Sequence, residues 1–182
     1  LLAEFPDIDL LQLTAPGCQP ILDWDVPGFP ACRAVNQHIF AMIEKLRPGR
    51  VILSSRWLGI DQDEKIIATI RKIRNAGVGE VIVIGPVPRW HPNLAEALTA
   101  KYRQQAFTVF PERLSAGLDV EKPEIDRRLA ALISQAGARY LSPLNLLCNE
   151  AGCLVRPVDD DFGNAVMAID DSHLSPEGSR YL

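Results

Sequence analysis

The sequence predicts an α/β fold in which helices cover both sides of a mainly parallel sheet. Short apolar runs alternate along the chain with segments whose apolar residues recur at helical spacing. The links between these segments are short, and a strand, helix, strand alternation of this kind gives right-handed crossovers between parallel strands. Neither an internal repeat nor a shift in composition divides the 182 residues. We therefore expect a single domain over residues 1–182.

Four short runs have the composition of strands that are covered on both faces. They are rich in β-branched and other apolar residues, as buried parallel strands tend to be. The runs are 8–13, 50–53, 81–84 and 139–141.

Three stripes of apolar residues predict the helices, because their members recur at spacings of three and four and so share one face. The stripes are Val35, Ile39, Met42, Ile43 and Leu46; Ile66, Ile67, Ile70 and Ile73; and Ile125, Leu129, Leu132 and Ile133. Each helix therefore has a single face to bury.

Composition limits the classes of function. With 47% apolar and 23% charged residues, the chain can bury a sizeable core and is not expected to be disordered. A net charge of −4 offers no basic surplus for phosphates, so we expect no nucleic-acid partner. No apolar run approaches the roughly 18 residues of a membrane span. Residues 1–13 also lack the pattern of a signal peptide, so any export signal is expected to lie upstream or to be absent.

The four cysteines fall into two pairs that are close in sequence. Cys18 lies close in sequence to Cys32, and Cys148 to Cys153, and each pair brackets loop-like sequence, although four cysteines allow three connectivities. This arrangement suggests disulfides and hence an oxidising compartment. The alternative is four buried thiols in a cytosolic protein. Neither pair has the C-x-x-C spacing of zinc or thioredoxin-like sites.

Ligands of open parallel sheets bind beyond the carboxyl ends of the strands, so the segments after each predicted strand are candidates for a site. These segments are 14–18, 54–57 and 85–91, and all three are expected on one rim of the sheet.

The segment 170–178 carries the residues best suited to acid–base chemistry. Ser175 is a plausible N-cap with Pro176 at the first helical position, so His173 stands just before a helix. Asp170, three residues earlier, can curl back to the imidazole, fix its tautomer and stabilise its charged form. The alternative is an aspartate that caps a turn beside a surface histidine.

Several motifs, in order along the chain, are similar to those of a known family. They are Leu-x-Leu-Thr-Ala-Pro-Gly-Cys-x-Pro at 11–20, Cys32, Val-Ile-Leu-Ser-Ser-Arg-Trp at 51–57, the pair Cys148 and Cys153, and Asp-x-x-His-Leu-Ser at 170–175 with Gly178. With them the whole chain resembles the SGNH hydrolases, and more closely the SGNH domains fused to membrane acyltransferase-3 proteins that O-acetylate bacterial surface glycans.

This resemblance implies a flavodoxin-like three-layer α/β/α sandwich and a Ser-His-Asp triad acting on acetyl or other short acyl esters. It assigns His173 and Asp170 to the triad. It also implies an acyl donor delivered by a membrane acyltransferase domain in the same full-length chain, a cell-surface glycan as acceptor, and a position at the periplasmic or extracellular face of the bacterial inner membrane. We expect neither a metal nor another cofactor.

The sequence departs from the family at the nucleophile. The family's serine lies in a Gly-Asp-Ser motif after the first strand, and no such motif occurs in this sequence. Residues 1–3 resemble the end of the helix that follows that strand, so we expect the first strand and the nucleophile loop to lie outside this chain. Ser54 and Ser55 are poor substitutes, because the glycines of a nucleophile elbow are missing around them.

A second departure concerns the oxyanion hole, which in this family combines a glycine amide with an asparagine side chain. Gly17 matches the glycine, but Ser54-Ser55-Arg56-Trp57 stands where the asparagine is expected. Ser55 or Arg56 could donate to the oxyanion or bind the acceptor. The alternatives are a surface ion pair for Arg56 and ordinary packing for Trp57.

Trp90 and His91 could form a wall on which a sugar stacks, although a tryptophan in such a loop is more often part of the core. A metal-dependent hydrolase is disfavoured, because His38, His91 and His173 are widely separated and lie in no metal-binding pattern. His38 receives no role. Residues 159–161, three aspartates, lack the rest of a calcium loop and are interpreted as a solvated turn.

Two functions from different classes follow. The first is an O-acyltransferase or esterase domain that uses His173 and Asp170 with a serine outside this chain. The second is a catalytically inert module that binds a glycan or partner for the membrane acyltransferase.

Overall fold

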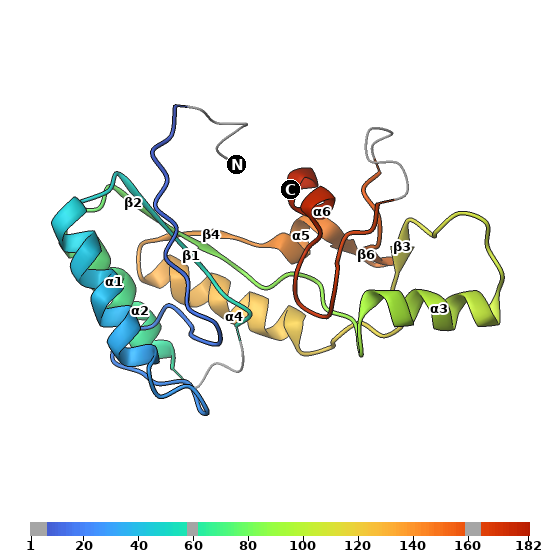
Figure 1. Cartoon of the computed structure of the whole chain (residues 1–182), viewed down its shortest axis with the longest axis horizontal. Coiled ribbons are helices and arrows are strands. Elements are labelled where there is room, and N and C mark those ends of the chain that lie inside the picture. The colour runs from blue at the N-terminus through green and yellow to red at the C-terminus, as the bar shows by residue number, and fades with distance from the viewer. Residues whose placement is uncertain (1–6, 58–61, 159–164) are drawn as a thin grey trace.

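The computed structural model describes residues 7–57, 62–158 and 165–182 (Figure 1). Its main sheet has three parallel strands in the order β1-β2-β4, which are β1 (Arg50–Ser54), β2 (Glu80–Ile84) and β4 (Arg139–Leu141). The α/β fold with a parallel sheet and three of the four expected strands are thereby confirmed.

The central strand is better covered than its neighbours. Val81, Ile82 and Val83 in β2 are buried, whereas Ile52 in β1 is 53% exposed and Leu141 in β4 is 37% exposed. Both exposed residues lie on strands at the edges of the three-stranded sheet. The expectation of strands buried on both faces therefore holds for β2 and fails for its neighbours.

The three helices expected from the apolar stripes are present. They are α1 (Cys32–Leu46), α2 (Asp63–Asn75) and α4 (Lys122–Gln135). Apolar residues of α2 and α4 join the strands in one core, which includes the fully buried Ile70, Val83, Leu129 and Ile133. The stripe expected for α1 is not its buried face, since α1 contributes mainly Phe40 to this core and Leu46 is 53% exposed.

The strand expected at 8–13 is absent, and that prediction was wrong. The side chains of Ile8, Leu10, Leu11 and Leu13 are 40–55% exposed, and these residues form no strand. A strand requires a neighbour to satisfy its backbone N–H and C=O groups. Within the described ranges, no strand pairs with these residues, so the apolar run stays an irregular segment.

The segment that follows is fastened to α1 and α2. The disulfide Cys18–Cys32 has an S–S distance of 2.10 Å. The buried amide of Asn36 donates to the carbonyl oxygens of Gln19 (2.7 Å) and Ile21 (2.9 Å). These contacts place the start of the chain against the helices without a strand.

A second, antiparallel sheet was not expected from the sequence. Its order is β3-β6-β5, from β3 (Arg113–Leu114), β6 (Gly152–Leu154) and β5 (Cys148–Asn149). The disulfide Cys148–Cys153 joins residues that face each other across β5 and β6, with an S–S distance of 2.05 Å. Both expected disulfides are thereby confirmed.

The remaining helices lie near this second sheet or at the end of the chain. They are α3 (Leu94–Gln104), α5 (Pro143–Leu147) and α6 (Pro176–Tyr181). In Figure 1, the red C-terminal segment lies between the parallel sheet and the part of the chain built from α3, β3 and β6. Residues 1–3 and 159–161, for which the sequence suggested a helix end and an acidic turn, are outside the described residues. No helix in the described ranges is long and apolar enough to cross a membrane.

Candidate active site

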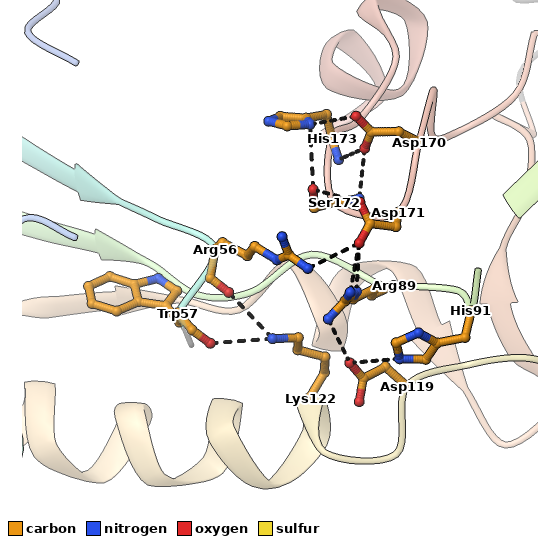
Figure 2. Close-up of polar contacts among 10 residues, drawn as sticks. All are labelled: Arg56, Trp57, Arg89, His91, Asp119, Lys122, Asp170, Asp171, Ser172 and His173. Carbon is orange, nitrogen blue, oxygen red and sulfur yellow. Dashed lines mark hydrogen bonds and ion pairs between the residues drawn. The ribbon is translucent and has the colours of Figure 1, made fainter. Parts of the chain in front are cut away.

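Asp170 and His173 form a hydrogen-bonded pair within one tight turn (Figure 2). The Asp170 Oδ2 atom lies 2.8 Å from His173 Nδ1, and Oδ1 accepts the backbone N–H groups of Ser172 and His173, each at 2.8 Å. The turn is closed at its base, where the Ile169 N–H donates to the His173 carbonyl at 3.1 Å. The aspartate thus builds the turn with one oxygen and orients the imidazole with the other.

The hydrogen bonds to Asp170 keep it ionised. The Ser172 backbone N–H, together with the side chain and N–H of His173, holds the pKa of Asp170 at about 2 despite partial desolvation. An ionised carboxylate can only accept, so Nδ1 of His173 carries a proton, and in the neutral imidazole Nε2 is the nitrogen that can accept one. The His173 side chain is 71% exposed, so the imidazole is accessible from the surface.

The helix after the pair begins as the sequence predicted. Ser175 is the N-cap of α6, its Oγ accepts the Gly178 N–H at 2.8 Å, and Pro176 opens the helix. Gly178 packs against the carbonyl group of Met167, where a Cβ would collide with backbone. This close approach gives Gly178 a structural reason to be a glycine.

The neighbouring carboxylate, that of Asp171, points away from the turn into a pair of arginines. Its Oδ2 atom accepts Arg89 Nε at 3.0 Å, Arg89 Nη2 at 2.7 Å and Arg56 Nη2 at 3.1 Å. Partial burial opposes ionisation of Asp171, but hydrogen bonds from Ser172 and Arg89 outweigh it and lower its pKa. Arg56 follows β1 and Arg89 follows β2, so these bonds join the turn to the rim of the parallel sheet.

Asp171, Arg56 and Arg89 belong to a charge network that also includes Asp119 and Lys122, near the start of α4 (Figure 2). Asp119, with a side chain 7% exposed, lies 3.5 Å from Arg89 Nη1 and 3.3 Å from His91 Nε2. Lys122, which is 5% exposed, donates to the carbonyl oxygens of Arg56 (3.4 Å) and Trp57 (3.3 Å). Burial lowers the pKa of Lys122, and Asp119 opposes this effect.

The predicted substrate-binding residues are only partly brought together. Arg56 reaches the turn through Asp171, so its interpretation as an ion-paired residue fits the geometry. Ser55 is half-buried directly after β1, and Gly17 lies exposed in a turn with φ of 75°. In the described part of the chain, neither of them has a hydrogen bond to Asp170 or His173.

Both tryptophans in the predicted set are buried. Trp57 is 2% exposed and its Nε1 donates to the Ile84 carbonyl at 2.7 Å. Trp90 is 1% exposed and packs with Leu94 and Leu98. The expectation of a sugar-stacking wall at Trp90 is therefore corrected: the ring is buried in the core beside residues of α3 and offers no exposed face to a sugar.

The other histidines lie apart from the turn. His38 is exposed on α1, and His91 contacts Asp119. Among the described residues, no group of three or more histidine, cysteine, aspartate or glutamate side chains is arranged to hold a metal.

Sequence reasoning missed the charge network. Arg89 lay in the predicted rim segment 85–91 and Asp171 in the segment 170–178, but a single arginine or aspartate gives no signal of its partner 82 residues away. Asp119 and Lys122 flank a predicted helix start, where acidic and basic residues are common for reasons of capping. The charges alone would not have identified the network.

Comparisons with known proteins give a consistent result. The sequence model of the family described as "SGNH domain (fused to AT3 domains)" matches residues 2–182. A solved structure, the periplasmic domain of a lipopolysaccharide acetyltransferase from Salmonella ser. Paratyphi A, is similar to this chain with a TM-score of 0.77 and 28% sequence identity. The match covers 91% of this chain and 66% of that chain, so this chain spans less than two thirds of its relative. No curated protein sequence matches.

Proposed function

Because the chain belongs to the SGNH domains that are fused to AT3 domains, we propose that it is the acid–base part of an O-acyltransferase or esterase site. The observation that carries the proposal is the Asp170–His173 pair, joined at 2.8 Å with the other imidazole nitrogen open to the surface. The proposed single domain includes residues 1–182. Its nucleophilic serine is supplied by sequence outside these residues.

The proposed reaction has two halves. The serine hydroxyl attacks the acyl carbonyl, His173 Nε2 takes the hydroxyl proton, and Asp170 stabilises the imidazolium. The tetrahedral intermediate then expels the donor's oxygen, which leaves with the proton from His173. In the second half, His173 deprotonates a glycan hydroxyl or water, which attacks the acyl-enzyme and returns the serine with its proton.

The oxyanion of each intermediate needs preorganised donors. We assign the Gly17 amide as one donor, and Ser55 as a second donor or an acceptor-binding group. Ser55 directly follows β1 and is half-buried, and Gly17 lies exposed in the irregular segment that precedes α1. Arg56 contributes through Asp171, since its guanidinium is already engaged there.

The proposed setting is the periplasmic or extracellular face of the bacterial inner membrane. All four cysteines are in disulfides, which form in oxidising compartments. The Salmonella relative is itself a periplasmic domain. The proposed donor is an acyl group, most simply acetyl, delivered by the membrane acyltransferase domain, and the proposed acceptor is a surface glycan such as lipopolysaccharide.

A second candidate function is a catalytically inert module that keeps the fold and binds a glycan or partner. The absence of a Gly-Asp-Ser motif from these 182 residues favours it. In this case the Asp170–His173 turn would be a structural feature of the surface.

Acetate release from an activated acetyl ester separates the two functions. The assay compares the full-length protein, the present 182 residues, and full-length His173→Ala. A matched control is His38→Ala, since His38 is an exposed histidine on α1. We expect activity from the full-length protein and His38→Ala, and loss of activity in His173→Ala and in the 182 residues alone. No acetate release from the full-length protein would support the inert module instead, and full activity in His173→Ala would exclude His173 as the base.

A further inference from the structure

The turn that carries Asp170 and His173 is attached to the rest of the molecule from two sides. On one side, backbone hydrogen bonds link it to the second, antiparallel sheet, called the small sheet below. The Ser175 N–H donates to the Met167 carbonyl (2.9 Å), and the Met167 N–H donates to the carbonyl of Val155 (2.8 Å), which directly follows β6. On the other side, the side chain of Asp171 reaches the rim of the parallel sheet. In the part of the chain that the structure describes, no strand joins this turn to the parallel sheet.

Arg89 makes the stronger of the two contacts at the rim. Its Nε and Nη2 both donate to Asp171 Oδ2, at 3.0 and 2.7 Å, and its side chain is 20% exposed. Arg56 makes one bond of 3.1 Å and is 42% exposed. Charge-assisted bonds gain strength when solvent is excluded, so Arg89 is the main tie.

Arg89 is also held in place by contacts other than those with Asp171. Asp119 Oδ2 forms an ion pair with its Nη1 at 3.5 Å, and the backbone N–H of Asp119 donates to the Arg89 carbonyl at 2.9 Å. The next residue, Trp90, is buried in the core. Asp119 therefore holds the guanidinium at Nη1, while Nε and Nη2 are directed at Asp171 in the turn (Figure 2).

We propose that Arg89 is a positioning residue, which holds Asp171 and thereby sets where the Asp170–His173 pair stands relative to the rim of the parallel sheet. The proposal rests on the function proposed above. The bonds inside the turn are local, so the pair keeps its own geometry without Arg89. What depends on Arg89 is the distance from His173 to groups carried by the rest of the domain.

The test uses four variants of the full-length protein: Arg89→Met, Arg89→Lys, Asp171→Asn and the double variant Arg89→Met with Asp171→Asn. The matched control is Arg50→Met. Arg50 pairs with Glu80 at 2.6 Å at the start of β1, the opposite end of the strand from Arg56. The readouts are kcat and KM for the activated acetyl ester, with His173→Ala measured alongside.

We expect Arg89→Met to lower kcat about 10- to 100-fold, because a shift of about 1 Å in a catalytic group can cost about a hundredfold. KM should stay within about threefold. Arg89→Lys keeps the charge but loses the two-nitrogen contact of the guanidinium, so its kcat should be intermediate. The double variant should lose no more than the worse single variant, because both changes remove the same tie. Arg50→Met should match the wild type.

A kcat for Arg89→Met and Asp171→Asn within about twofold of wild type, in a protein that His173→Ala inactivates, would overturn the proposal. Additive losses in the double variant would also overturn it. If Arg89→Met does not accumulate, Asp171→Asn carries the test, since it removes the charge without changing side-chain volume. Indifference to His173→Ala would overturn the proposed function itself, and this inference with it.

Discussion

Asp170 and Asp171 are adjacent in the sequence, but different parts of the chain hold their carboxylates. Asp170 accepts from Ser172 and His173, within three residues. Asp171 accepts from Arg56 and Arg89, which are 115 and 82 residues away. The local turn fixes the geometry of the Asp170–His173 pair, and the long-range ion pairs of Asp171 attach the turn to the rim of the parallel sheet. Different substitutions should therefore disturb the internal geometry of the pair (its shape) and its position relative to the parallel sheet (its place).

The largest expected effect comes from the local turn. Asp170→Asn replaces the acceptor for Nδ1–H with an amide that can favour the wrong tautomer of His173. We expect kcat/KM of the full-length protein for an activated acetyl ester to fall about 10³- to 10⁴-fold, as for the aspartate of a Ser-His-Asp triad. The measurement is initial-rate acetate release.

The matched control is Asp171→Asn, the same change one residue along. It leaves the pair intact and should cost at least tenfold less than Asp170→Asn. Equal losses in the two variants would contradict the division between shape and place.

The second effect concerns the small sheet, to which the turn is attached through Met167 and Val155. Cys148→Ala with Cys153→Ala opens a short loop of sequence separation 5, and we expect a loss of about 2 kcal/mol in the free energy of unfolding. Cys18→Ala with Cys32→Ala opens a separation of 14 and should cost about 3 kcal/mol. Denaturant unfolding of the domain gives both values.

The two disulfides should differ in what they do to the site. Loss of Cys148–Cys153 loosens the sheet that supports the turn, so we expect faster amide exchange in residues 165–175. Loss of Cys18–Cys32 should leave exchange in this segment unchanged. The reverse pattern would show that the small sheet does not support the turn.

The sequence was sufficient for features that arise from local pattern. The stripe of Ile66, Ile70 and Ile73 predicted α2, and the apolar run at 81–84 predicted β2, because each buries its residues in the core. The Asp170–His173 contact followed from a spacing of three residues. Ser175 and Pro176 likewise predicted the start of α6.

The features that were missed depend on distant partners. The run 8–13 has the composition of a strand, but composition does not supply a neighbour for its backbone. The strands β3 and β5 are two residues long, too short for a periodic signal. Sugar stacking and core packing were both open for Trp90, and its burial beside Leu94 and Leu98 decides for packing. The ion pair of Arg89 with Asp171 joins residues 82 apart, and neither local sequence indicates it.

A smaller effect distinguishes the two arginines that hold Asp171. Arg56→Met removes one bond of 3.1 Å from a side chain that is 42% exposed. Exposed ion pairs contribute little, so we expect a fall in kcat of about threefold or less, well below that of Arg89→Met. Steady-state kinetics of both variants, side by side, test this order. A larger loss for Arg56→Met would give Arg56 a direct role, such as binding the acceptor.

The smallest expected effect is the pH dependence of stability that Asp170 contributes. Its pKa is lowered from 3.8 to about 2 in the folded chain, so the folded state prefers the ionised form. The stabilisation is therefore complete above about pH 4 and is lost as the pH falls through about 2. Because the side chain is 46% exposed, solvent screening limits the effect to about 1–3 °C in Tm. We expect the Tm of the wild type to exceed that of Asp170→Asn by this margin at pH 6, and the two Tm values to converge near pH 2. A constant difference from pH 6 to pH 2 would mean that the turn is held by something other than the ionised carboxylate.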